Sequence, residues 1–211
     1  KSNFIHHDTL WQLDNSAYAC ISKKYIYIKD FNLHAKNQFL KINGKSSLLD
    51  SDRLLFDIKN FDLSGLAYFW KSINLDIKGK ASGSFKLDGG FNSQIFSTDF
   101  SIDKMQLNKQ KFGKLKLNTF FKKPNNVVNL ILSVENKTKK SNNILIKGDF
   151  YPKENGRIKM KAEFKNTQLK FLERYFDGVF SNFKGGKTTG DIAINGTVKH
   201  PVFDGDLKVD H

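Results

Sequence analysis

The chain has 211 residues, of which 39% are hydrophobic, and carries a formal net charge of +14. This composition is typical of a globular protein, and no run approaches the roughly 18 apolar residues that a membrane-spanning helix needs. The first residues also lack the charged, apolar and small regions of a signal peptide. Because the sequence starts and stops within a regular pattern, we expect a piece of a longer protein.

The positive charge comes almost entirely from lysine, with arginine only at Arg53, Arg157 and Arg174. Proteins that read nucleic acids usually rely on arginine, whose planar fork suits phosphates and base edges. Here lysines alternate with apolar residues, so lysines and aromatics fall on opposite faces of a strand and cannot form a stacking platform. We expect a solvated lysine face and no nucleic-acid partner; an attraction to anionic lipid headgroups is the functional alternative.

Strict alternation of apolar and polar residues dominates the chain and predicts half-buried strands. The alternating apolar positions are Ile26 and Ile28, Phe56 and Ile58, Ile77, Phe85 and Leu87, and the segments 115–121, 128–134, 144–150 and 158–164. Turn residues separate the later segments at 123–126, 136–143 and 152–156. Such short connections predict antiparallel hairpins, with strands of about 8–9 residues.

Two stretches break the alternation with apolar residues at helical spacing. They lie near residues 66–72 and 169–176, and a return to strand follows each of them. We expect one short amphipathic helix at each place, on the apolar side of the sheet.

An internal repeat relates the two halves of the chain. The segment from Gly83 to Gly89 returns 107 positions later as Gly190 to Gly196, and the similarity continues downstream to Asp103 and Asp210. A period of this length predicts stacked supersecondary units rather than a compact enzyme. We expect one continuous β array with a truncated repeat at 1–60, a full unit at 61–165 and the start of a second unit at 166–211.

The predicted strands share one apolar face, which must be hidden from water. A sheet that folds over on itself would cover this face with its own side chains, whereas an open trough would need lipid chains or another protein. The alternation alone leaves both possibilities open. The candidate binding residues on this face are Phe85, Leu87, Phe96, Phe100, Ile102, Leu115, Leu117, Phe121, Val128, Leu130, Leu132, Val134, Ile144, Ile146, Phe150, Ile158, Met160 and Phe164.

No group of residues indicates catalysis. His6 and His7 are adjacent and so point to opposite faces of a strand, which argues against a shared metal ion. Cys20 is the single cysteine and has no partner histidine, and Asp99 and Asp206 recur at one repeat position where a structural role suffices. We expect no enzyme activity, no catalytic residue, no metal and no cofactor.

The order of these segments resembles the C-terminal region of the TamB family, the translocation and assembly module proteins of Gram-negative envelopes. The resemblance rests on the stretch from Asn60 to Asp103 and on its copy from Asn166 to Asp210. Each contains an apolar strand and a helical segment, then Gly-Lys-x-x-Gly, and finally a motif that reads Pro-Val-Phe-Asp-Gly-Asp-Leu at 201–207. The strands around Lys111–Leu117 and Ile146–Pro152 also look typical of the family.

TamB proteins are AsmA-like and are similar to bridge-like lipid transfer proteins. The resemblance implies a mainly β fold, in which a long antiparallel meander curls into an open, U-shaped groove called a β-taco. It also implies a periplasmic location, with a parent protein anchored in the inner membrane and reaching the outer membrane. The implied partners are phospholipids and, through the parent protein, an Omp85-type outer-membrane barrel similar to TamA.

The leading hypothesis is therefore a groove that conducts phospholipids between the two membranes and contributes to outer-membrane biogenesis. One alternative is a scaffold or chaperone module for outer-membrane protein assembly, which would receive a client strand by strand addition. The other is a closed β-sandwich that serves as an interaction domain of a large envelope protein.

Overall fold

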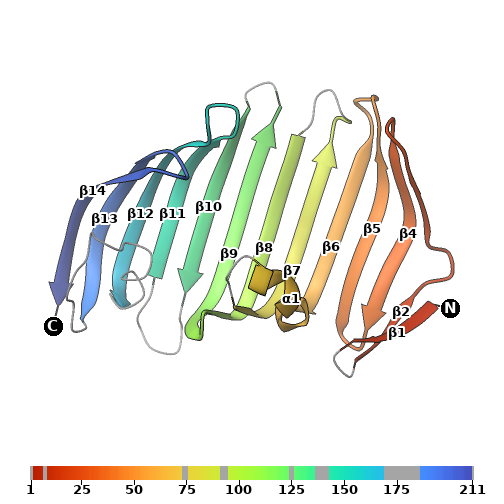
Figure 1. Cartoon of the computed structure of the whole chain (residues 1–211), viewed down its shortest axis with the longest axis horizontal. Helices are drawn as coiled ribbons and strands as arrows, with labels where there is room; N and C mark the ends of the chain where they lie inside the picture. The colour runs from red at the N-terminus through yellow and green to blue at the C-terminus, as the bar shows by residue number, and fades with distance from the viewer. Residues whose placement is uncertain are drawn as a thin grey trace.

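A computed structural model describes residues 2–6, 9–72, 76–90, 95–123, 126–135, 143–168 and 186–210. It contains one sheet of fourteen strands (Figure 1). The strands are β1 (Ser2–His6), β2 (Thr9–Leu13), β3 (Tyr18–Ile21), β4 (Ile26–Ala35), β5 (Gln38–Ser46), β6 (Arg53–Asp62), β7 (Ile77–Asp88), β8 (Ile95–Leu107), β9 (Gln110–Lys122), β10 (Val127–Glu135), β11 (Asn143–Tyr151), β12 (Arg157–Gln168), β13 (Lys187–Gly196) and β14 (Pro201–Asp210).

The sheet is an antiparallel meander. Neighbours in the sheet follow one another in sequence, except that β2 pairs with β4 while β3 pairs with the other end of β4. The turns explain this topology: β8 and β9 are joined by two residues only, Asn108 and Lys109, with φ values of 49° and 69°. Positive φ at both positions is the signature of the tight turn that matches the twist of a hairpin.

The strands are longer than the expected 8–9 residues, since β8 and β9 each have 13. Irregular positions conceal this length in the sequence, because each bulge shifts the alternation by one residue. In β8 the register shifts between Ile102 and Met105. Apolar side chains still lie on the same face after the shift, but their positions in the sequence no longer follow the alternation that precedes it.

The first expected helical segment contains a 3-10 turn, η1 (Leu63–Leu66), followed by α1 (Ala67–Ser72). Six residues are too few to cover a face of the sheet, and Tyr68 is 92% exposed, so an amphipathic helix that covers the apolar side is not supported. The second expected segment, near 169–176, lies outside the described residues. One helix per repeat therefore stays a prediction.

The sequence repeat has a structural counterpart in strand register. Nine consecutive residue pairs of β7 and β8, from Lys80↔Asp103 to Asp88↔Ile95, return 107 residues later as pairs of β13 and β14. The preceding strands correspond too, at an offset of 106 residues: β6 pairs with β7 as β12 pairs with β13, and both pairings contain a bulge at the same place. The expected boundary at 60/61 thus falls inside β6.

The two bulges are built alike. Asn60 has a φ of 51° and Asn166 a φ of 49°. The backbone N–H of Asn60 donates to the Ser82 hydroxyl at 2.9 Å, and that of Asn166 donates to the Thr189 hydroxyl at 3.2 Å. Asparagine tolerates this left-handed conformation better than most residues, which explains its presence at both bulges.

A glycine next to each bulge lets two strands approach closely. Gly83 and Gly190 both have a φ of 151°. A Cβ atom on Gly83 would lie 2.1 Å from the carbonyl oxygen of Asp99, and one on Gly190 would lie 2.2 Å from that of Asp206. Only glycine fits these two positions without a shift of the backbone.

The sheet is open. Its path begins at β1 and ends at β14, which lie at opposite ends of the molecule (Figure 1). Among the described elements, extensive contacts join only neighbouring strands, apart from those that η1 makes with β7 and α1. The described strands therefore do not close into a sandwich over their own side chains.

Candidate functional site

The eighteen candidate residues lie on one face of the sheet. Cross-strand partners share a face, and the register arranges all eighteen in four rows that cross β7 to β12. The rows are Leu87, Phe96, Phe121, Val128, Phe150 and Ile158; Phe85, Leu130 and Met160; Phe100, Leu117, Leu132 and Ile146; and Ile102, Leu115, Val134, Ile144 and Phe164. We call this surface the apolar face.

The apolar face carries no charge over a long distance. From β4 to β14, no Lys, Arg, Asp or Glu occupies a described position in register with these rows. Two hydroxyl groups do lie among the rows, and they bond to each other, with 2.8 Å between Oγ1 of Thr98 and Oγ1 of Thr119. Each of these hydroxyl groups thus has a hydrogen-bond partner on a face whose described rows hold no other hydroxyl, amide or charged side chain.

Most of the apolar face is half-buried. Of the eighteen candidates, only Val134, Ile144, Ile158 and Phe164 are buried, and the others keep part of their surface accessible. Neighbouring side chains on the same sheet account for this partial burial, and the extensive contacts of the described strands include no second layer across the face. The face thus presents accessible apolar surface along several strands.

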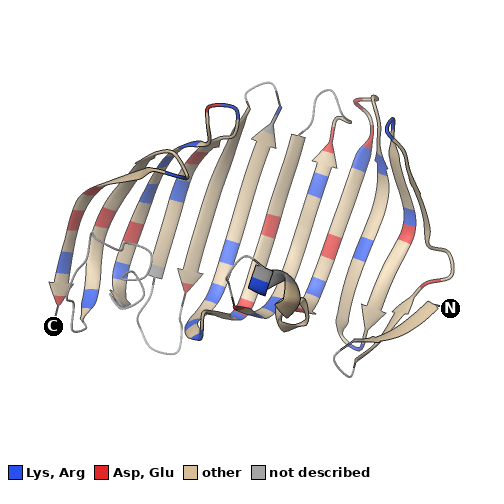
Figure 2. Ribbon diagram, viewed as in Figure 1, with Lys and Arg blue, Asp and Glu red and all other residues tan. Residues whose placement is uncertain are grey.

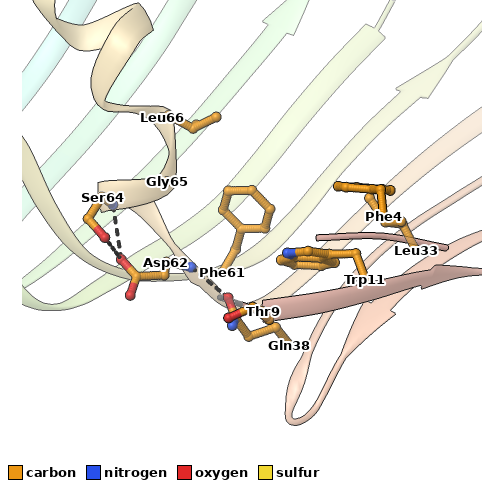
Figure 3. Close-up of a pocket in the computed structure, with 10 residues that line it drawn as sticks. All are labelled: Phe4, Thr9, Trp11, Leu33, Gln38, Phe61, Asp62, Ser64, Gly65 and Leu66. Carbon is orange, nitrogen blue, oxygen red and sulfur yellow. Dashed lines mark hydrogen bonds between the residues drawn. The ribbon is translucent and has the colours of Figure 1, made fainter. Parts of the chain in front are cut away.

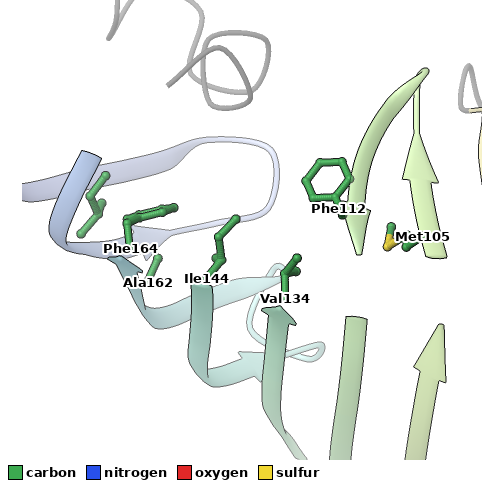
Figure 4. Close-up of a cluster of buried hydrophobic side chains, with 7 residues drawn as sticks. Met105, Phe112, Val134, Ile144, Ala162 and Phe164 are labelled. Carbon is green, nitrogen blue, oxygen red and sulfur yellow. The ribbon is translucent and has the colours of Figure 1, made fainter. Parts of the chain in front are cut away.

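A cluster of buried side chains occupies one end of the apolar face (Figure 4). Its members come from the same end of six strands, and they are Met105, Phe112, Val134, Ile144, Ala162, Phe164 and Ile192. Figure 4 shows Val134 and Ile144 on adjacent strands, Ala162 and Phe164 together on the next strand, and Phe112 and Met105 on the other side of Val134.

Four phenylalanine rings form a chain of contacts across β6 to β9, and in β8 and β9 they lie at the end away from the buried cluster. The ring centroids of Phe56 and Phe85 lie 5.5 Å apart, those of Phe85 and Phe96 5.9 Å, and those of Phe96 and Phe121 4.9 Å. The last pair is stacked and the first is edge-to-face, both of which are favourable arrangements. These contacts fix the positions of four large side chains across β6 to β9.

A pocket of about 290 Å³ extends the apolar face toward the N-terminus (Figure 3). Its floor holds Trp11 and Phe61, whose ring centroids lie 5.7 Å apart. Polar groups gather on one side, where Asp62 accepts hydrogen bonds from the backbone N–H and the hydroxyl of Ser64 at 2.9 and 2.7 Å. The other lining residues are Phe4, Thr9, Leu33, Gln38, Gly65 and Leu66.

The opposite face is charged, and charged positions occur along most of the strands (Figure 2). Cross-strand ion pairs offset part of the positive charge, including Lys114–Asp103 at 3.2 Å and Lys161–Asp191 at 2.7 Å. The hydrogen bond and the charge of Asp191 raise the pKa of Lys161. The two faces of the sheet therefore differ sharply in polarity.

Four residues of the buried cluster were not among the candidates: Met105, Phe112, Ala162 and Ile192. Alternation places Phe112 on the charged face with Lys114 and Lys116. In the structure, a register shift between Met105 and Gln106 leaves Phe112 as an extra residue, and its side chain packs in the cluster. A glycine within a strand often marks a bulge, so Gly113 could have predicted this one; its φ is 95°.

The candidates also stop short of the full apolar face. Ile194, Phe203, Leu207 and Val209 of β13 and β14 pack against the buried cluster. The 107-residue repeat relates Phe203, Leu207 and Val209 to candidates Phe96, Phe100 and Ile102 and could have identified them.

Other chemistry is sparse in the described parts of the chain. No group of three or more His, Cys, Asp or Glu there is placed to hold a metal ion. His34 contacts Asp14 at 3.2 Å, and the Cys20 thiol lies 3.3 Å from the Tyr25 hydroxyl; His7 is outside the described residues. None of the described helices has the length and hydropathy to cross a membrane.

Comparisons with protein-family models, with curated proteins and with solved structures give no match to this chain.

Proposed function

We propose that the apolar face is the wall of a U-shaped groove that holds the acyl chains of phospholipids. The observation that carries the proposal is an accessible apolar surface that runs across the strands of an open sheet without a single charged residue in register, over the positions that the structure describes. Each methylene that leaves water for such a surface gains roughly 0.8 kcal/mol, so a fatty-acid chain is a suitable occupant.

The same surface would exclude the lipid headgroup. A phosphate on the apolar face would find no counter-charge among the described residues there, and an unpaired buried charge costs far more than a methylene gains. Headgroups therefore stay at the open, wet side of the groove. An acyl chain can slide between equivalent positions because the described rows offer no directional partner beyond Thr98 and Thr119, which bond each other.

The place of this groove in a cell follows from the resemblance to TamB proteins. We propose a periplasmic segment of a parent protein that is anchored in the inner membrane and conducts phospholipids toward the outer membrane. In this proposal the parent acts with an Omp85-type barrel similar to TamA, and the segment contributes to outer-membrane biogenesis. The repeated register of β6–β8 and β12–β14 supports a groove that is built from successive units.

Native mass spectrometry of the purified chain, followed by extraction and identification of bound lipid, tests the proposal. We expect bound phospholipid in the unaltered protein and its loss in Leu132→Asp. Ile131→Asp is the matched control, because Ile131 is the preceding residue of β10 but is 46% exposed on the opposite face. It should keep the lipid. Circular dichroism checks that both variants fold, and Leu117→Gln replaces Leu132→Asp if that variant does not.

Two results would contradict a lipid groove. One is a folded, lipid-free protein that also fails to take up phospholipid from vesicles. The other is equal lipid occupancy in Leu132→Asp and Ile131→Asp. A folded protein without lipid would favour the scaffold alternative.

A further inference from the structure

The charged face of the sheet has a hollow of about 570 Å³ over β11 to β14. The charged residues that line it are Lys147, Asp149, Lys159, Lys161, Asp191 and Asp204. Lys147 follows Ile146, a candidate of the apolar face, so its side chain points to the opposite side of the sheet. β11, β12 and β13 are paired with neighbours on both sides, so the hollow is not a feature of a sheet edge.

Two lysines face each other in this hollow. Lys147 of β11 is directly opposite Lys161 of β12, and like charges at such positions destabilise a sheet. Lys161 is compensated by Asp191 at 2.7 Å, whereas Lys147 forms no ion pair within the part of the chain that the structure describes. The positive charge of Lys147 therefore has no counter-charge there.

A third lysine is uncompensated for a different reason. The register places Asp149 opposite Lys159. Both carboxylate oxygens of Asp149 are engaged elsewhere, however, because one accepts from the Asn129 amide at 2.6 Å and the other from the Tyr151 hydroxyl at 3.4 Å. Lys159 thus lines the hollow without an ion pair to any described residue.

An amide lies next to these lysines. Asn195 follows Ile194, the partner of Met160, and so lies beside Lys159 on β13. It lines the hollow, and its side-chain amide has no hydrogen-bond partner among the described residues. Neighbouring strands are about 4.8 Å apart, so the donors of Lys147, Lys159 and Asn195 on three successive strands can reach one ligand.

We propose that this hollow is a binding site for a phosphate group, which accepts hydrogen bonds from Lys147, Lys159 and Asn195. A phosphate monoester carries a charge of about −1.5 to −2 at neutral pH and three strong acceptor oxygens. It therefore pairs with both free ammonium groups at once and offsets the repulsion between Lys147 and Lys161. A carboxylate, with one charge and two oxygens, fits three donors less well. The phosphate belongs either to a lipid headgroup at a membrane surface or to a soluble molecule.

An NMR titration of the full chain with inorganic phosphate tests the site, with chloride exchanged for phosphate at constant ionic strength. We expect saturable shifts that include the side-chain amide of Asn195. Lys147→Gln and Lys159→Gln should each weaken binding at least about fivefold, because each removes a charge-assisted hydrogen bond. Both lysines are exposed, so the variants should fold.

Lys86→Gln is the matched control. Lys86 is an exposed lysine of β7, lies between Leu55 and Ser97 of the neighbouring strands, and has no ion pair to a described residue. Its replacement lowers the net charge by the same amount, so the general attraction of the chain for anions falls equally. Phosphate binding should weaken less than about twofold in this variant.

Urea denaturation gives a second measure of the same site. In chloride, Lys147→Gln should raise the unfolding midpoint, because it removes the repulsion from Lys161. In phosphate, this advantage over the unaltered chain should shrink or reverse, since only the unaltered chain keeps the full site. The general stabilising effect of phosphate on proteins acts on Lys86→Gln as well and is subtracted with it.

Vesicle co-sedimentation identifies the source of the phosphate. The vesicles contain phosphatidylcholine with or without phosphatidic acid, whose headgroup is a phosphate monoester. Binding that requires phosphatidic acid and is weakened by Lys159→Gln, but not by Lys86→Gln, supports the site with a lipid headgroup as ligand. Saturable binding of inorganic phosphate without binding to either vesicle supports it with a soluble ligand.

The proposal is overturned if the shifts grow linearly with phosphate and never saturate. It is also overturned if Lys86→Gln weakens binding as much as Lys159→Gln does, because the attraction is then a property of the whole charged face. The site lies on the side of the sheet opposite to the proposed lipid groove, so neither result bears on the groove.

Discussion

Replacement of Gly83 by alanine should destabilise the sheet strongly. The new Cβ would lie 2.1 Å from the carbonyl oxygen of Asp99 and 2.7 Å from Cα of Phe100, so backbone atoms would have to move. Alanine at a φ of 151° adds strain of about 1–3 kcal/mol. Overpacking adds about 1–3 kcal/mol more. We expect a loss of about 4 kcal/mol in the free energy of unfolding.

Gly156→Ala is the matched control. Gly156 also has a positive φ, of 69°, but the atoms nearest to its added Cβ are side-chain carbons at 3.8 and 3.9 Å. Only the backbone preference is lost there, at a cost of about 1–2 kcal/mol. Urea denaturation followed by far-ultraviolet circular dichroism measures both variants. Equal losses for Gly83→Ala and Gly156→Ala would refute the argument that close strand approach makes glycine necessary at Gly83.

Three further predictions concern single contacts. Thr119→Val should cost about 1 kcal/mol because it leaves the Thr98 hydroxyl unpaired, and the double valine variant should recover most of it in urea denaturation. Phe96→Ala should cost about 3 kcal/mol by the same assay through loss of two ring contacts. In an NMR titration, Asp191→Asn should lower the raised pKa of Lys161; the ion pair stabilises the fold below that pKa and is lost as pH rises through it.

Alternation in the sequence predicted the strands and their faces well, because successive side chains of a strand point to opposite faces of the sheet. All eighteen candidates lie on one face for this reason. The prediction failed where a bulge adds a residue, as at Phe112, since a bulge changes the phase without changing the composition. Alternation also could not predict the pocket around Trp11 and Phe61, because its lining residues come from segments far apart in the sequence.

Openness could not be predicted from the residues themselves. A sheet with one apolar face has the same alternation whether it closes or stays open. The two arrangements differ in whether a strand packs across the face, and the extensive contacts between described strands all join sheet neighbours. The repeat, in contrast, could be predicted from the sequence, and its recurring glycines have a structural reason: Gly83 and Gly190 occupy positions where a Cβ atom would clash with the neighbouring backbone.

The repeated register of β6–β8 and β12–β14 also sets a length scale. Six inter-strand spacings separate β6 from β12 along the sheet, and neighbouring strands lie about 4.8 Å apart, so one duplication extends the sheet by roughly 29 Å. The number of strands per duplication has to be even, since an odd number would reverse the direction of every following strand and break the match between turns. Growth of such a sheet by whole duplications would therefore proceed in increments of about the thickness of a bilayer's hydrocarbon core.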